Sequence, residues 1–480
     1  MKYRGRLVID TYESTQLENI NQLKQSNKQS LKQLGMKNSS QCASCNVLSE
    51  DNRASKEVTV TEASHILHVS VDTIRRWAKL GLLRCKRDSH NNRVFELHEL
   101  QSLQKRRENH SNSSQPRFVV LKSKQTSFTS VELFAGAGGT ALGMHNAGFK
   151  HVMLNEVDKS ACATLRKNQP KWNIVEKDVH DVDFSAYLGK VDLLQGGVPC
   201  QAFSYAGLSK GFEDARGTLF FEFARAVQQI KPKVLMMENV RGLLTHDSGK
   251  TIMTMLHILD DIGYKVAAKI LRAQFLDVAQ KRERLVLIGV RKDLDMPILY
   301  PKEDSDVLTL WDAIGKCPES EGAKYPESKK KVLNLVPAGG YWKDLPLSVQ
   351  KDYMKGSFSL PGGKTGMARR LSWSEPSLTL TCAPAQKQTE RCHPQETRPL
   401  TVREYARIQS FPDDWQFEGS LASKYKQIGN AVPCNLAYHV GRGIISMLSG
   451  ENRESFREIQ PFDMTNITVE EVKSEALSML

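Results

Sequence analysis

One cysteine of the sequence is expected in a rigid turn at the end of an apolar strand. The strand is expected within the unit HDVDFSAYLGKVDLLQGGVPC, residues 180–200, and runs into the turn Pro199-Cys200-Gln201. A free cysteine is most often a small buried residue. However, open α/β sheets bind ligands at the carboxyl ends of their parallel strands, so Cys200 is a candidate thiolate nucleophile. Glu238 lies near the end of another apolar strand, 232–240, and is a candidate proton donor.

A glycine-rich turn, FAGAGG, forms a second candidate site between an apolar strand and a helix. Small residues there let the backbone approach a ligand at the helix N-terminus. The turn lacks the Lys-Ser/Thr of a phosphate-binding loop and departs from the spacing GxGxxG. Glu156 ends the next strand, where an acid can accept ribose hydroxyl groups, and Asp178 follows a third strand. Together these features indicate an adenosine-bearing ligand without a phosphate, although each acid alone would more often be a surface residue.

Six sequence blocks occur in the order found in DNA cytosine-5 methyltransferases, and the chain resembles that family from residue 128 to about 448. The order of six blocks is far more specific than any single motif. The blocks are residues 134–139, Pro199-Cys200-Gln201, Glu238-Asn239-Val240, residues 280–284 (QKRER), residues 398–407 and residues 429–433 (GNAVP).

The resemblance implies a covalent mechanism. Carbon 5 of cytosine is not nucleophilic, so Cys200 would first add to carbon 6 as a thiolate. Glu238 would hold and protonate N3, Arg284 would bind O2, and Arg282 would brace the site. The activated ring would then accept a methyl group from S-adenosylmethionine, and loss of the carbon 5 proton would release Cys200.

The resemblance also implies the residues that hold S-adenosylmethionine. Phe134 would pack on the adenine, Glu156 would bind the ribose, and Asp178 would bind the adenine amino group. Val157 stands where many relatives carry an aromatic residue. The other residues expected in the cofactor pocket are Gly136, Gly138, Gly139, Val179, Pro199, Leu219, Asn430 and Val432.

Double-stranded DNA is the substrate that the resemblance implies, with the target base flipped out of the duplex. Residues 292–396 are poor in family blocks, as a target-recognition region would be, and Thr379-Leu380 matches a dipeptide found near the flipped base. Each arginine expected at the DNA would, alone, be equally consistent with a solvated surface charge. The residues expected to contact DNA are Gln201, Ser204, Arg370, Thr379, Leu380, Arg75 and Arg76.

The N-terminal region carries a second resemblance. Thr59 and Glu62 predict a capping box that opens a helix, a second helix follows at 71–79, and Asn91-Asn92 predicts a hairpin turn. This stretch resembles the winged helix-turn-helix of the MerR and excisionase type, with Arg75 and Arg76 on its recognition helix. A small helical protein–protein module is the alternative interpretation.

The expected fold is α/β. It combines a Rossmann-like S-adenosylmethionine-dependent methyltransferase domain, whose sheet is mixed and mostly parallel, with a smaller target-recognition domain and an N-terminal winged helix-turn-helix. The predicted boundaries are a flexible polar arm at 1–55, the helix-turn-helix at 56–107, a linker at 108–127, the catalytic domain at 128–291, the target-recognition domain at 292–400, a return to the catalytic domain at 401–448 and a C-terminal tail at 449–480.

Composition limits the partners and the compartment. The 480 residues include 67 Lys and Arg against 54 Asp and Glu, a net charge of +13 that favours a polyanionic partner. With no long apolar run, we expect no membrane partner and a location in the bacterial cytoplasm, at the nucleoid. Nine cysteines, an odd number, indicate a reducing compartment. The pair Cys42 and Cys45 has no second pair to complete a zinc site, so no metal is expected.

The sequence therefore predicts a sequence-specific DNA cytosine-5 methyltransferase with S-adenosylmethionine as cofactor, paired in function with a restriction endonuclease. A transfer-RNA cytosine-5 methyltransferase is one alternative, but the Cys-Phe-Thr tripeptide expected of that branch is absent. A DNA-binding regulator is the other. Because Cys200, Glu238 and Arg284 are all present, regulation is expected as an added activity at most.

Overall fold

The computed structural model describes most of the chain from Glu57 onward. The described residues are 57–67, 71, 74, 75, 78, 83–89, 91–101, 104, 115–198, 219–304, 306–361 and 364–478. Several predictions fall outside these residues. They concern the arm at 1–55, Arg76, Pro199, Cys200, Gln201 and Ser204.

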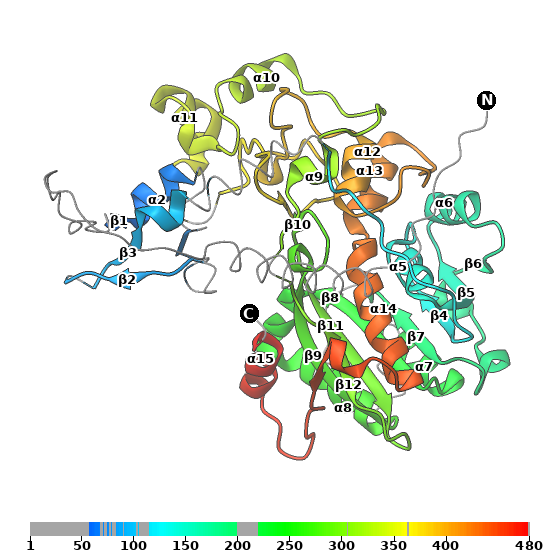
Figure 1. Cartoon of the computed structure of the whole chain (residues 1–480). Helices are drawn as coiled ribbons and strands as arrows, with labels where there is room; N and C mark the ends of the chain where they lie inside the picture. The colour runs from blue at the N-terminus through cyan, green and yellow to red at the C-terminus, as the bar shows by residue number, and fades with distance from the viewer. Residues whose placement is uncertain are drawn as a thin grey trace, which may run out of the picture. The chain divides into compact units, whose positions relative to one another are not determined.

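A seven-stranded sheet, in the order β6-β5-β4-β7-β8-β11-β9, forms the centre of the fold (Figure 1). The five strands from β6 to β8 run parallel, whereas β11 is antiparallel to both of its neighbours. The mixed, mostly parallel sheet confirms the predicted fold class. The strands are β4 (Thr129–Leu133), β5 (Lys150–Glu156), β6 (Ile174–Glu176), β7 (Leu193–Gly196), β8 (Val234–Val240), β9 (Tyr264–Arg272) and β11 (Glu283–Arg291).

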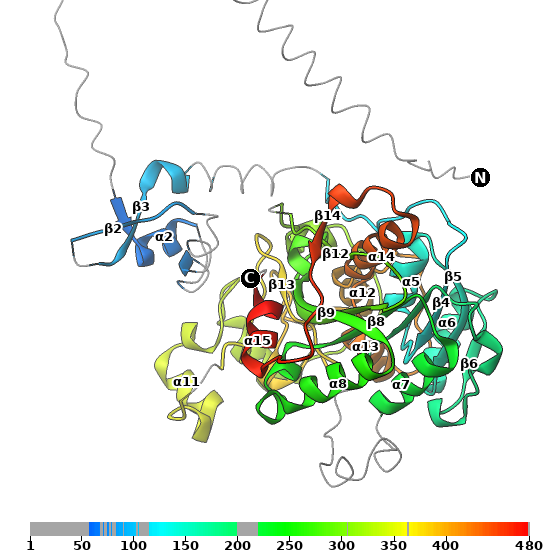
Figure 2. The same cartoon turned by 90° about the horizontal axis from the view of Figure 1, so that it is seen from below.

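Helices cover both faces of this sheet, which explains why its central strands are apolar along their whole length. On one face, α7 (Leu219–Ile230) and α8 (Lys250–Asp261) share an apolar cluster with Leu194 and Leu235. On the other, α5 (Gly139–Ala147) and α14 (Cys434–Ser449) share a cluster with Leu193 and Met236. Figure 2 shows the sheet between these two helix layers. A ligand site can therefore form at the carboxyl ends of the strands.

A further apolar cluster lies in the segment between the sheet and the returning chain. Tyr325, Leu333, Trp342, Met354 and Met367 contribute to it. Strand β13 (Ser377–Leu378) of this segment pairs in parallel with the short strand β10 (Gln280–Lys281), which lies just before β11 in the chain. Its helices are α9 (Leu310–Ile314), α10 (Glu327–Asn334) and α11 (Leu347–Met354).

The returning chain forms α12 (Val402–Ile408), α13 (Leu421–Asn430) and α14. Beyond it, β14 (Phe456–Ile459) pairs antiparallel with β12 (Ile298–Pro301). Next, α15 (Val469–Leu477) packs its buried Val472 and Ala476 into the cluster shared by α7 and α8. The segment predicted as a tail therefore contributes a strand and a helix to the fold. The predicted domain boundaries stay predictions.

Among the described N-terminal residues, a small antiparallel sheet is accompanied by the helix α2. The sheet contains β1 (Glu57–Thr59), β3 (Arg93–Glu96) and β2 (Lys86–Arg87), and α2 (Val60–Ile66) follows β1. The capping box between Thr59 and Glu62 is present, as predicted. Asn91 has a φ of 64° in the turn between β2 and β3, which confirms the predicted hairpin turn.

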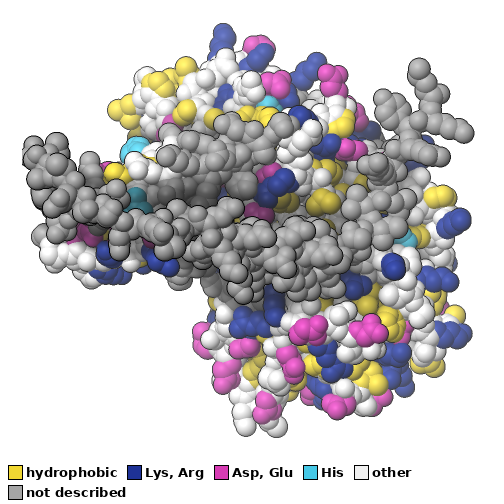
Figure 3. Space-filling view, viewed as in Figure 1, with side chains coloured by type: hydrophobic (Ala, Val, Ile, Leu, Met, Phe, Trp, Pro, Cys, Tyr) yellow, Lys and Arg dark blue, Asp and Glu magenta, His cyan; other side chains and the backbone are white. Residues whose placement is uncertain are grey.

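The described surface is mixed in charge. On the face seen in Figure 3, dark blue Lys and Arg side chains are interspersed with magenta Asp and Glu side chains. In the described part of the chain, every helix is too short or too polar to cross a membrane.

Candidate active site

One pocket of about 790 Å³ opens at the carboxyl ends of β4, β5, β7 and β8. This volume lies within the range of about 300–1,000 Å³ typical of small-molecule sites. Residues predicted for the cofactor and for the target base line the same pocket. They are Phe134, Gly136, Gly139, Glu156, Val157, Asp178, Val179, Leu219, Glu238, Arg282, Arg284, Asn430 and Val432.

The glycine-rich turn needs its small residues for close packing. Gly138 has a φ of +89° and caps the start of α5, and a Cβ there would lie 2.7 Å from Leu165 and 3.1 Å from Trp415. A Cβ on Gly139 would lie 2.2 Å from the carbonyl oxygen of Val432. The turn therefore brings the N-terminus of α5 into contact with the returning chain, and this contact shapes one side of the pocket.

Two acids at this end of the pocket are held as hydrogen-bond acceptors. The Glu156 carboxylate accepts the backbone N–H of Gly136 at 2.7 Å and the N–H groups of Val157 and Asp158 at 2.8 Å. Asp178 Oδ1 is hydrogen-bonded to the ring Nδ1 of His180 at 2.6 Å and accepts the backbone N–H of His180 at 3.0 Å. These hydrogen bonds lower the pKa of Asp178. Backbone donors thus orient Glu156, and ordinary solution conditions leave Asp178 ionised.

Glu238 and Arg284 form an ion pair in the pocket. Arg284 Nε lies 2.5 Å from Glu238 Oε1, and only 12% and 14% of the two side chains are exposed. The antiparallel register of β8 and β11 places Glu238 opposite Val286, two residues along the strand from Arg284. Burial lowers the pKa of Arg284, and the charge of Glu238 opposes this shift. The pair presents a carboxylate and a guanidinium side by side, as recognition of a cytosine edge would require.

The same carboxylate lies close to the strand that leads to Cys200. A Cβ on Gly197 would be 3.4 Å from Glu238 Oε2. The neighbouring Asn239 donates its Nδ2 to the carbonyl oxygen of Val198 at 3.0 Å. The chain therefore enters Pro199 and Cys200 from a point fixed beside Glu238, although the cysteine itself lies outside the described residues. This Asn239 contact was not predicted from the sequence.

Arg282 connects three segments beneath the pocket. Its Nη1 donates to the carbonyl oxygens of Gly429 at 3.2 Å and Leu380 at 3.4 Å, and its Nη2 donates to Asn430 at 3.5 Å. Burial lowers the pKa of Arg282 to about 9, so the guanidinium stays charged at neutral pH. These contacts give a physical basis for the bracing role predicted for Arg282.

Two buried glutamines also connect the segment at Leu380 with the returning chain. Sequence reasoning missed this role. Leu380 N–H donates to Gln280 Oε1 at 2.9 Å, and Gln280 Nε2 donates to Gln409 Oε1 at 2.7 Å. Gln409 Nε2 in turn donates to the carbonyl oxygens of Ile428 and Ala431 at 2.7 and 3.0 Å. No local spacing in the sequence indicates that these two glutamines meet.

Two protein-family models match the chain. The model of the C-5 cytosine-specific DNA methylase matches residues 128–446, and that of the MerR family regulatory protein matches residues 59–95. The chain belongs to the C-5 cytosine-specific DNA methylase family. The protein is therefore a DNA cytosine-5 methyltransferase, and its cofactor is S-adenosylmethionine.

Similar proteins support this identification. The Type II methyltransferase M.Eco47II of Escherichia coli is 54% identical over 419 residues, which cover 84% of this chain and 98% of that protein. The Type II methyltransferase M.PspPI of Psychrobacter sp. is 58% identical over 340 residues, which cover 69% of this chain and 82% of that protein. Among solved structures, a DNA modification methyltransferase encoded within an E. coli prophage shares the fold, with a TM-score of 0.50, 24% identity and coverage of 67% of this chain and 100% of its own. The methyltransferase is thus of the Type II kind.

The predicted DNA contacts of the methyltransferase fall into different environments. Leu380 is buried, and Thr379 Oγ1 donates to the carbonyl oxygen of Lys281 at 2.7 Å, so this dipeptide lies beside Arg282 at the pocket. Arg75 is exposed on a helical segment. Ser204, Gln201 and Arg76 lie outside the described residues.

Arg370 has a different role from the predicted one. Its side chain is buried, with the residue only 4% exposed. The guanidinium donates to the carbonyl oxygens of Val336 and Leu333 at 2.8 Å and to Thr397 Oγ1 at 2.7 Å. The carbonyl of His393 accepts a further hydrogen bond at 3.1 Å. These bonds hold the core of its own segment together, so the predicted DNA contact is corrected to a structural one.

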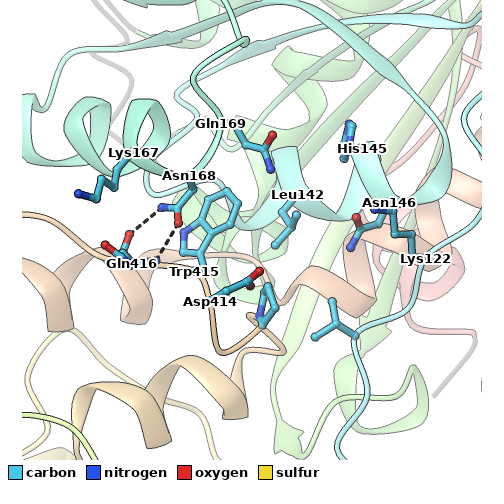
Figure 4. A pocket seen from close by; sticks show the side chains of 12 residues that line it. Lys122, Leu142, His145, Asn146, Lys167, Asn168, Gln169, Asp414, Trp415 and Gln416 are labelled. Carbon is cyan, nitrogen blue, oxygen red and sulfur yellow. Dashed lines mark hydrogen bonds between the residues drawn. The ribbon is translucent and has the colours of Figure 1, made fainter. Parts of the chain in front are cut away.

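A second pocket, of about 380 Å³, contains none of the predicted site residues (Figure 4). Leu142 of α5 and Trp415 of the returning chain line it. Asn168 and Gln416 exchange two hydrogen bonds at its edge, at 2.7 and 2.8 Å. The Trp415 ring also underlies Gly138, so this pocket lies behind the glycine-rich turn.

Proposed function

We propose that the methyltransferase transfers a methyl group to carbon 5 of a cytosine flipped out of double-stranded DNA, through a covalent bond to Cys200. We further propose that it protects DNA from a cognate restriction endonuclease. One observation supports the reaction most strongly. The glycine-rich turn, the Glu238–Arg284 pair and the strand end that leads to Cys200 all meet at one pocket.

The residues at the turn fit S-adenosylmethionine. Glu156 and Asp178 are acceptors for hydroxyl and amino groups, and the cofactor carries both on its ribose and adenine. Val157 is 62% exposed although it lines the pocket, and so offers apolar surface to a ring. When bound, the cofactor supplies a methyl group on a positively charged sulfur. Phe134, Asn430 and Val432 would complete its surroundings.

The other end of the pocket fits a cytosine. Arg284 donates to O2, while Glu238, in its protonated form, donates a proton to N3 as negative charge develops there and takes it back when the product forms. The Cys200 thiolate adds to carbon 6, which turns carbon 5 into a nucleophile that accepts the methyl group. Loss of the carbon 5 proton to a base then restores the double bond and expels the thiolate. Arg282 holds Arg284's strand against the returning chain during these steps.

The substrate must be delivered as a flipped base, because carbon 6 is inaccessible inside a duplex. The segment that contains β13 is the expected recognition element, since Thr379 and Leu380 lie beside Arg282. Pairing with a restriction endonuclease is supported by the names of the relatives, which are Type II methyltransferases.

Bisulfite sequencing tests the reaction directly. Plasmid DNA from a methylation-deficient host that expresses the chain should show protected cytosines within one short motif. The Cys200→Ser variant should lose protection, with methyl transfer reduced by at least about 10³-fold, because the hydroxyl group does not supply the thiolate nucleophile. It should still bind duplex DNA in a gel shift. Protection by the variant, or unprotected DNA from well-expressed wild-type protein, would contradict the proposal.

A second function is supported by the match of residues 59–95 to the MerR family model. We propose that this region binds DNA upstream of its own gene and regulates expression. The capped helix α2, the β2–β3 hairpin and the exposed Arg75 support this proposal. The full-length protein should shift its own upstream DNA in preference to random duplex, and Arg75→Ala should weaken that shift while methylation rates stay close to wild type. Equal affinity for both DNAs would remove the regulatory function.

A further inference from the structure

An exposed cysteine in the predicted target-recognition domain, residues 292–400, contacts a residue of the cofactor pocket. This stretch of chain is called the recognition segment. Cys382 follows β13 after a short run, Thr379 to Thr381, and its thiol is exposed. Its Sγ donates to Asn430 Oδ1, with the two atoms 2.9 Å apart. Asn430 is the last residue of α13 and lines the pocket. No role of Cys382 is part of the reaction described above.

Close backbone packing holds the two segments together. A Cβ on Gly429 would lie 2.4 Å from the carbonyl oxygen of Thr381, so the segments touch at the position of a glycine that no larger residue could occupy. Arg282 donates both to Leu380 and to Gly429 and thereby ties the same two segments from below. The thiol contact is thus the exposed end of this packed region, and the backbone next to each partner is held by these contacts.

The thiol contact determines which end of the amide is available to a ligand. A side-chain amide offers an oxygen that accepts and a nitrogen that donates two protons. The Cys382 thiol donates to Oδ1 and thereby sets the orientation of the Asn430 amide, whose Nδ2 group then offers its protons to an acceptor in the pocket. A hydrogen-bond acceptor, such as the carboxylate of the methionine part of S-adenosylmethionine, matches that nitrogen.

We propose that Cys382 is a positioning residue, which orients the Asn430 amide so that its Nδ2 donates to the bound cofactor. The inference rests on the proposed placement of S-adenosylmethionine in this pocket. It links the recognition segment to cofactor affinity, because the thiol and the predicted base-proximal dipeptide Thr379-Leu380 belong to the same run of chain.

Binding of S-adenosylhomocysteine, measured by calorimetry on the full-length protein, tests this role. Cys382→Ala should weaken binding by about three- to tenfold, the effect of losing one neutral hydrogen bond. Cys382→Ser restores a donor and should bind within about twofold of wild type. Cys85→Ala, which removes another exposed thiol, should bind as wild type. All three variants should keep the wild-type melting temperature, because the thiol is on the surface.

Alkylation provides a second measurement that does not depend on activity. Iodoacetamide should modify Cys382 at least about threefold more slowly when S-adenosylhomocysteine is bound, since the bound ligand fixes Asn430 and the thiol contact with it. The rate at Cys85 in the same sample should not change. Mass spectrometry of the two peptides measures both rates.

The outcomes separate this inference from the proposed function. If wild type binds S-adenosylhomocysteine and Cys382→Ala binds it equally well, the positioning role is overturned and the cofactor pocket stands. If the serine variant behaves like the alanine variant, the contact does not act as a hydrogen-bond donor and the role is overturned as well. Absence of binding to wild type would overturn both.

Discussion

Glu132 is a carboxyl group buried in β4, two residues before Phe134 of the glycine-rich turn. Burial, together with the nearby charge of Glu156, raises its pKa to about 8, although a hydrogen bond from Gln195 Nε2 at 2.5 Å acts in the opposite direction. At neutral pH the folded protein therefore holds this group largely in its protonated form.

This burial makes stability depend on pH. Between the unfolded pKa near 4.5 and the folded pKa near 8, the folded state holds one more proton than the unfolded state. The free energy of unfolding should fall by roughly 1.4 kcal/mol per pH unit over this window because of Glu132 alone. Glu132→Gln should remove that slope, so its stability advantage over wild type should grow from pH 5 to pH 8. Urea unfolding at several pH values measures the difference, and parallel curves would contradict it.

Arg370 should matter for stability rather than for DNA affinity. Arg370→Ala leaves several buried carbonyl oxygens without donors, at about 1–3 kcal/mol for each one that water does not reach. We expect a lower melting temperature and an unchanged salt dependence of DNA binding. Lys351→Ala, at an exposed cation on α11, is the matched control and should leave the melting temperature unchanged. A weaker DNA complex with a wild-type melting temperature would restore Arg370 as a DNA contact.

Most residues of the candidate site could be predicted because each belongs to a short block at the end of an apolar strand. Glu156 and Glu238 are of this kind. The sequence did not predict that Gln280, Gln409 and Asn239 connect separate segments, because their hydrogen-bond partners are distant in the chain. Several of these partners are backbone carbonyls, which every residue has, so no sequence pattern marks them. Arg370 was misassigned for a related reason. Charge is visible in a sequence, whereas burial against five acceptors is not.

At the level of elements, α5 depends on small residues where it packs against the returning chain. Gly139→Ala would force a Cβ against the Val432 carbonyl, and we expect a loss of about 1–3 kcal/mol of unfolding free energy together with weaker S-adenosylhomocysteine binding. At Gly356 a Cβ meets only open space, so Gly356→Ala should change neither quantity. Thermal unfolding and calorimetry on the two variants measure both quantities. Equal stability and equal affinity of the two variants would show that the returning chain can move away from the added Cβ at little cost.

The elements divide into those that local pattern predicts and those that it does not. Strands β4, β5, β7 and β8 are apolar runs bounded by turns, and each was expected. The pairing of β12 with β14 was not expected, because it joins a strand near the start of the predicted target-recognition domain to a strand that follows α14. Short strands of this kind form through tertiary contacts, and their own four residues carry little signal.

At the level of the whole molecule, the C-terminal helix should stabilise the sheet. Val472 and Ala476 are fully buried, and the buried Lys269 Nζ donates to Glu475 O at 2.5 Å and to Ser478 Oγ at 2.7 Å. A chain that ends at residue 460 loses these contacts, so we expect a loss of at least about 3 kcal/mol of unfolding free energy. The control is Glu470→Ala, whose exposed side chain should matter little. An unchanged melting temperature of the shortened chain would contradict this expectation.

The pairing of β12 with β14 also has a consequence for synthesis on the ribosome. Strand β12 is complete long before its partner is translated, because most of the recognition segment and the helices α12, α13 and α14 lie between them. At about 5–20 residues per second, the nascent strand waits many seconds with its backbone donors and acceptors unpaired. During that interval we expect the emerging chain to present an open strand edge to other nascent chains on the same messenger RNA. Slow translation of the recognition segment would lengthen this exposure, and a chaperone that covers β12 would shorten it.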